Sequence, residues 1–226
     1  MLMKATRIGL CKNQLKTIVL VLGATAVFAL TAHAADVLRY KGRPGSKVTI
    51  AGTANIHDWT MKGELISGFM EVPADIQFDQ SKATLSGVKN GKVDARVEVS
   101  IPVTSMTGNW SGMDAPYQDA MNATEHPQIQ FRLIEMSAKE PHAPATPFQF
   151  DAKGELSFNG ATNVITMPVS IENLDQGKLK IVGKVPLKMT DFKVKPPVKA
   201  GIFRTGDEVV ISFEWLVALP KTATPK

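Results

Sequence analysis

The stretch FQFDAKGELSFN, residues 148–159, alternates apolar or small residues with polar residues along its whole length. Successive side chains of a β-strand point to opposite faces of a sheet, so one face of this stretch is apolar and the other is polar. The same alternation occurs in residues 93–104, 179–189 and 209–217. Weaker versions occur in residues 46–53, 57–70, 129–133 and 165–171. The pattern predicts about eight antiparallel strands.

Turn-forming residues separate these segments. Glycine preceded by Asn, Gln or Thr tolerates the positive φ angles that tight hairpin turns require. The predicted turns are Asn90-Gly91, Asn159-Gly160, Gln176-Gly177 and Thr205-Gly206-Asp207. Their spacing indicates a chain that meanders from each strand to its neighbour. The proline-rich residues 141–147 are expected to form a loop.

Residues 113–123 depart from the alternation and predict one short helix. Asp114 is placed to cap its N-terminus, and Pro116 falls in the first turn, where its missing N–H costs little. The apolar residues at helical spacing are Met113, Tyr117 and Met121.

Strands of about ten residues are long for a globular protein, and closure into a barrel removes the edges at which such strands aggregate. Gly154 and Gly183 lie on the apolar face in mid-strand. They either permit the coiling of a barrel and leave room for a ligand, or relieve crowding in a filled core. The fold class expected is an all-β, antiparallel barrel of about eight strands with one short helix.

The N-terminus has the pattern of a secretory signal peptide. Basic residues without acids precede an apolar run at 18–30, which is shorter than the about 20 residues that span a bilayer. Ala32-His33-Ala34 follows as a small-x-small cleavage site. We therefore expect residues 1–34 to be removed on bacterial export, with an uncleaved anchor as the alternative. What remains is a soluble periplasmic or secreted domain at 35–220, with no transmembrane segment, and a flexible tail at 221–226.

Charge and cysteine content change when the signal is removed. Residues 1–34 contain four of the 26 basic residues and none of the 21 acidic ones, so the remainder is close to neutral. This balance argues against a nucleic-acid partner. The only cysteine, Cys11, is also removed, so stability must come from a hydrophobic core.

Seven segments, in this order, resemble the YceI-like domain family: Gly52–Thr60, Tyr117–Ala123, His126–Phe131, Gly154–Thr162, Leu187–Phe192, Lys195–Pro197 and Gly206–Val209. They extend over nearly the whole mature chain. The His57-Asp58-Trp59 form differs from the more usual start of the family. The resemblance implies an exported lipocalin-like barrel, and some family members bind a polyisoprenoid chain inside it. It also makes a homodimer an alternative to a monomer.

The resemblance leads us to expect a carrier that encloses a long apolar, polyisoprenoid-like or quinone-like lipid, with no other cofactor and no metal. Affinity would come from apolar burial, at about 0.8 kcal/mol per methylene. Trp110, in a loop before the helix, and His57 are expected at the barrel mouth. The other candidate ligand-binding residues lie on the apolar strand faces: Val97, Val99, Phe131, Leu133, Phe148, Phe150, Ile181, Val185, Ile211 and Phe213.

Three alternatives remain open. The same apolar residues would also fill the core of a small barrel that holds no ligand. The first alternative is therefore a solid-cored periplasmic interaction or stress-response module without a small ligand. An outer-membrane barrel would carry girdles of Trp and Tyr, which this sequence lacks. An enzyme or redox partner acting on isoprenoid quinones is the third alternative. We expect no catalytic residues, because adjacent His57 and Asp58 face opposite ways on a strand and no nucleophile motif is present.

Overall fold

A computed structural model describes residues 36–110, 112–141, 143–174, 176–199 and 203–220. The predicted signal peptide at 1–34 and tail at 221–226 lie outside these residues. The first strands are β1 (Val37–Gly42), β2 (Lys47–Ala54), β3 (Trp59–Gly63), β4 (Ser67–Pro73), β5 (Lys92–Val93), β6 (Arg96–Pro102) and β7 (Thr107–Gly108). The remaining strands are β8 (Gln128–Lys139), β9 (Phe148–Phe158), β10 (Ala161–Asn173), β11 (Lys178–Lys188), β12 (Val198–Lys199) and β13 (Phe203–Ala218). The helices are α1 (Asp114–Ala120) and the 3-10 helices η1 (Val103–Ser105) and η2 (Met189–Phe192).

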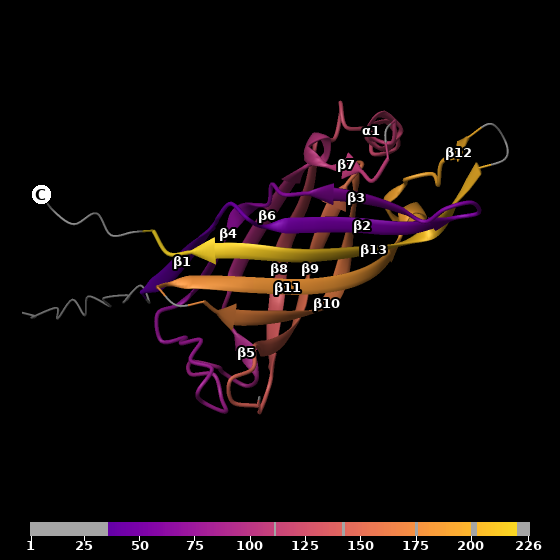
Figure 1. The fold of residues 1–226 in the computed structure, drawn as a ribbon. Coiled ribbons are helices and arrows are strands. Elements are labelled where there is room, and N and C mark those ends of the chain that lie inside the picture. Colours follow the sequence, from indigo (N-terminus) through magenta and orange to yellow (C-terminus); the bar gives the residue numbers. More distant parts are fainter. Residues whose placement is uncertain (1–35, 111, 142, 175, 200–202, 221–226) are drawn as a thin grey trace, which may run out of the picture. The chain divides into compact units, whose positions relative to one another are not determined.

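The strands close into an antiparallel barrel (Figure 1). In the described residues the order around the barrel is β1-β4-β6-β8-β9-β10-β11-β13. Strand β1 pairs back onto β13 through Gly42 and Val217, which completes the ring. Three strands of the ring are extended past a break toward the α1 end: β2 extends β1, β3 extends β4, and β7 extends β6. These extensions pair with one another in the order β2-β3-β7, and β2 also pairs with β13. The predicted eight-stranded meander is confirmed, with its first two strands each divided in two and the third divided into β5, β6 and β7.

Three of the four predicted turns are confirmed. Asn90, Asn159 and Gln176 have φ angles of 52°, 49° and 51°, and the glycine after each also has a positive φ. The prediction at residues 205–207 is wrong, because these residues lie inside β13. The pairing of β13 with β2 shifts register between Thr205 and Val209, so the local irregularity is a bulge and not a turn.

The strand predicted at 93–104 is interrupted. Residues 92–93 form β5 and residues 96–102 form β6, which pair with β8 on opposite sides of a bulge between Leu133 and Glu135. From Val93 to Glu98 the chain advances five residues while β8 advances four, from Met136 to Arg132, so one extra residue between β5 and β6 breaks the strand. By contrast, β9 spans Phe148–Phe158, almost the whole of the stretch that predicted it.

Helix α1 is shorter than the predicted 113–123, and the predicted cap is wrong. Met113 occupies the N-cap position, and no side chain caps the helix. The Asp114 carboxylate instead accepts a hydrogen bond of 2.7 Å from the backbone N–H of Gly108. This bond attaches α1 to strand β7 and so fixes the helix across one end of the barrel.

The opposite end of the barrel is closed by the segment between β4 and β5. Ile76, Phe78 and Leu85 from this segment are 2%, 4% and 5% exposed, respectively. The Phe78 ring meets Phe148 edge-on, with ring centroids 6.1 Å apart. Figure 1 shows this segment at the end of the barrel away from α1.

The structure decides between the two interpretations of Gly154 and Gly183. A Cβ at Gly154 would clash with the ring of Phe131, and one at Gly183 would clash with the ring of Phe213. Each glycine therefore makes room for an aromatic ring from the neighbouring strand. At these two positions the missing side chains relieve crowding in a packed interior.

Candidate functional site

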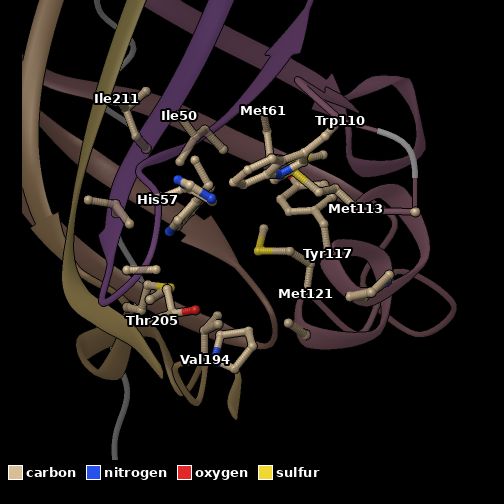
Figure 2. A pocket seen from close by; sticks show the side chains of 18 of the residues that line it. Ile50, His57, Met61, Trp110, Met113, Tyr117, Met121, Val194, Thr205 and Ile211 are labelled. Atoms are coloured by element: carbon tan, nitrogen blue, oxygen red, sulfur yellow. The ribbon is translucent and has the colours of Figure 1, made fainter. Parts of the chain in front are cut away.

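An apolar cavity of about 500 Å³ lies at the α1 end of the barrel. In Figure 2, Ile50, Met61 and Ile211 line it on the strand side and Met113, Tyr117 and Met121 on the helix side. The complete lining is Ile50, Ala54, Ile56, His57, Trp59, Met61, Trp110, Gly112, Met113, Pro116, Tyr117, Ala120, Met121, Ile129, Phe158, Met189, Val194, Pro197, Thr205, Val209 and Ile211. Among the described lining residues none is Asp, Glu, Lys or Arg.

Four methionines give this cavity adaptable walls. Met61 extends from β3, Met113 and Met121 flank α1, and Met189 begins η2. A methionine side chain is unbranched and rotates about three bonds, so it fits its shape to different apolar molecules. The walls therefore suit a hydrocarbon ligand better than a polar one.

Two buried polar atoms without a partner in the described part of the chain lie among these apolar walls. The indole N–H of Trp59 and the hydroxyl of Tyr117 are buried and have no hydrogen-bond partner among the described residues. Burial raises the pKa of Tyr117, so its hydroxyl stays neutral and protonated. Each buried donor without a partner costs about 1–3 kcal/mol. Trp59 itself is held against β2, because Gly52 has no Cβ to keep its ring away.

The rim of the cavity is aromatic and exposed. His57 and Trp110 pack together with ring centroids 5.5 Å apart and an interplanar angle of 58°. Trp110 is 41% exposed, and its neighbour in sequence, Asn109, accepts a hydrogen bond of 3.1 Å from the backbone N–H of Thr60. The structure thus places both residues predicted for the mouth at the cavity rim.

A second, smaller cavity of about 80 Å³ lies deeper in the barrel. Five of the predicted ligand-binding residues line it: Val99, Phe131, Val185, Ile211 and Phe213. Ile129 and Ile211 line both cavities and so mark the boundary between them. The interior narrows sharply beyond this boundary.

Five other predicted residues line neither apolar cavity. Phe148 and Phe150 are 2% and 1% exposed, and Ile181 and Val97 are also buried in the core. Leu133 is partly buried against the same core. These side chains face the barrel interior, as the alternation predicted, but lie where the interior is filled.

Sequence reasoning missed several cavity residues, although signals for them were present. Met113, Tyr117 and Met121 were recognised at helical spacing, and an apolar helix face must be buried against something. The missing step was to place α1 across the barrel end, which depends on the Asp114–Gly108 hydrogen bond and not on the helix sequence.

A third hollow, of about 650 Å³, lies at the opposite end and has a mixed polar and apolar lining. Its polar groups are largely engaged within the protein. The Gln80 side chain accepts a hydrogen bond of 3.0 Å from the N–H of Asn173, and Asp79 accepts one of 2.6 Å from the Ser81 hydroxyl. These bonds hold the closing segment in place, so this hollow is a weaker candidate for a ligand site.

Two further features are absent from the described part of the chain. No group of three or more His, Cys, Asp or Glu side chains there is arranged to hold a metal ion. None of the helices in that part is long and apolar enough to cross a membrane.

Comparison with known proteins identifies the barrel. A model of the YceI-like domain matches residues 54–216, which is more than half of the chain. The chain belongs to the YceI-like domain family. Among curated proteins, none matches it.

Solved structures share the YceI-like fold. Burkholderia cenocepacia BcnA is 20% identical, with a TM-score of 0.54 over 76% of this chain and 95% of BcnA. A polyisoprenoid binding domain from Saccharophagus degradans, implicated in plant cell wall breakdown, is 12% identical, with a TM-score of 0.55 over 82% of this chain and 100% of that domain. At these identities the likeness concerns the fold.

Proposed function

We propose that this protein binds an apolar, isoprenoid-like lipid in the cavity at the α1 end of its barrel and shields it from water. The observation that carries the proposal is the cavity itself, about 500 Å³ of space walled by hydrocarbon, aromatic and thioether groups. Protein interiors are close-packed, and pockets of about 300–1,000 Å³ with apolar walls are typical of small-molecule sites. The description of the Saccharophagus degradans domain supports the choice of ligand class.

The lipid would enter with its chain first. The deeper cavity has only apolar side chains and the indole of Trp215 around it, whereas His57, Thr205 and the exposed Trp110 lie around the outer cavity. A polar end group loses its hydration if it is buried without a partner. The polar end would therefore stay near the rim, where it reaches water.

The solid-cored alternative requires an interior that is filled along its whole length. The core around Phe148 and Phe150 meets this requirement, but the α1 half does not. We place the binding function in the periplasm or outside the cell, because residues 1–34 have the pattern of an export signal. There it would carry or sequester a lipid between membranes. The homodimer stays a prediction.

A pair of substitutions on α1 tests the proposal. Ala120 lines the cavity, whereas Ala115 is exposed on the same helix and is absent from the described lining. Ala120→Trp would place an indole in the cavity, so we expect a loss of about tenfold or more in affinity for a prenol of three isoprene units. Ala115→Trp, the matched control, should bind as the unchanged protein does.

Isothermal titration calorimetry measures both affinities, and circular dichroism checks that each variant is folded. Saturable binding at one prenol per chain, weakened only by Ala120→Trp, supports the proposal. Absence of binding to the unchanged protein, or equal binding to both variants, would overturn it.

A further inference from the structure

We infer that this barrel limits the length of the lipid chain it encloses, and that the rings of Phe131 and Phe213 form the floor at which the chain stops. The inference rests on the proposed lipid-binding function and adds ligand size to it. It follows from the way the interior changes along the barrel axis.

On two strands the inward side chains become almost fully buried beyond the cavities. Along β13, Ile211 and Phe213 are partly exposed, whereas Trp215 and Val217 are 2% and 1% exposed. Along β10, Ile165 is partly exposed, and exposure then falls from 7% at Met167 to 5% at Val169 and 1% at Ile171. The residues beyond those that line the inner cavity, Val169 and Ile171 on β10 and Val217 on β13, are therefore packed in a filled core.

The two phenylalanine rings at the inner cavity are fixed in place. Phe131 packs over Gly154 on β9, and Phe213 packs over Gly183 on β11. Both rings line the small inner cavity and neither lines the large outer one. Because each ring occupies the space that its glycine leaves free, a rotation away from the floor would give up that packing.

The free volume sets the size of the ligand. A water molecule takes about 30 Å³ of liquid volume, so 500 Å³ holds roughly fifteen to twenty heavy atoms, or about three to four isoprene units. The inner cavity of about 80 Å³ adds only a few more atoms. Additional units of a longer chain must remain outside the rim or displace the rings of the floor.

The test compares prenols of two, three, four, six and eight isoprene units. Native mass spectrometry of the full chain with pairs of prenols gives their relative affinities from the ratio of the two complexes. We expect affinity to rise by about tenfold or more per unit while units enter the cavity. Beyond four units it should change by less than about twofold, because further units gain no burial.

Substitution of the floor should move this limit. Phe213→Ala opens the inner cavity, so the six-unit prenol should gain affinity over the four-unit prenol. Phe213→Leu, a milder change, keeps the test valid if the alanine variant does not fold. Phe148→Leu is the matched control: its ring is buried at the filled end and lines neither apolar cavity, so it should leave the limit at four units.

The outcomes separate the two proposals. A rise in affinity that continues through eight units in the unchanged protein overturns the length limit and leaves lipid binding intact. A limit that does not move in Phe213→Ala or Phe213→Leu overturns the role of the ring. Failure of every prenol to bind overturns the proposed function and the length limit together.

Discussion

The two halves of the barrel come from the same alternating pattern but have different interiors. In the half that carries α1, flexible methionines and small residues surround about 500 Å³ of free space. In the other half, neither apolar cavity reaches the buried side chains of Phe148 and Phe150 or the closing residues Ile76 and Phe78. The comparison teaches that alternation determines which side chains face inward, whereas their summed volume determines whether a ligand fits.

The largest expected effect is on stability, and a matched pair of isoleucines measures it. Ile171 in the filled half is 1% exposed, whereas Ile211 is partly exposed and lines both cavities. Ile171→Ala should lower the free energy of unfolding by about 4 kcal/mol, because it opens a new void in packed surroundings. Ile211→Ala should cost about 2 kcal/mol, since part of that side chain already faces empty space. Urea denaturation measures both losses; equal losses would contradict the difference between the halves.

The unpaired hydroxyl of Tyr117 gives an effect of opposite sign. Removing a buried donor that has no partner relieves its desolvation cost, so Tyr117→Phe should raise the free energy of unfolding by about 1 kcal/mol. Tyr40→Phe is the control, because the Tyr40 hydroxyl is not among the buried polar atoms without a partner. Thermal and urea unfolding report the change. A loss of stability in Tyr117→Phe would indicate that the hydroxyl has a partner in solution.

The smallest expected effect concerns the pH dependence of stability. Asp207 on β13 accepts hydrogen bonds of 2.9 Å from the N–H and 2.7 Å from the hydroxyl of Thr190 in η2, and these bonds lower the pKa of Asp207. A lowered carboxylate pKa contributes stability above the pKa of the unfolded chain, and this contribution is lost as pH falls through the folded-state pKa.

Asp207→Asn should therefore be less stable than the unchanged protein at neutral pH, and the difference should disappear in acid. Urea midpoints measured from neutral pH down to strongly acidic pH test this. Asp119→Asn, at an exposed position on α1, is the control. A difference that stays constant at all pH values would exclude Asp207 as its source.

Much of the fold was predictable from local sequence. The alternation at 148–159 predicts an extended strand, and the Asn-Gly pairs at 90 and 159 predict turns with positive φ angles. The structure confirms both. The interruption of the strand at 93–104 was not predictable from the alternation, which continues through Asp94 and Ala95 although one extra residue there shifts the register against β8. Local pattern does not report a register set by a neighbouring strand.

The candidate site was predictable only in part, for a related reason. Alternation placed Val99, Phe131 and Phe148 on the inner face alike, but packing against residues distant in sequence decides which of them borders free space. Trp110 and His57 were placed at the mouth through the loop position and the family resemblance. The helix residues Met113 and Tyr117 were missed as lining, because their contribution depends on where α1 is attached.

Methionine methyl groups provide the most direct test of the central claim that lipid binds in the α1 half and not in the filled half. Met61, Met113, Met121 and Met189 line the outer cavity, whereas Met70 and Met136 are buried and line neither apolar cavity. In a protein labelled with carbon-13 at these methyls, titration with a three-unit prenol should shift the four cavity signals saturably and leave Met70 and Met136 nearly unchanged. Shifts of equal size at Met70 and Met136, or no saturable shift at the four cavity methionines, would contradict the account.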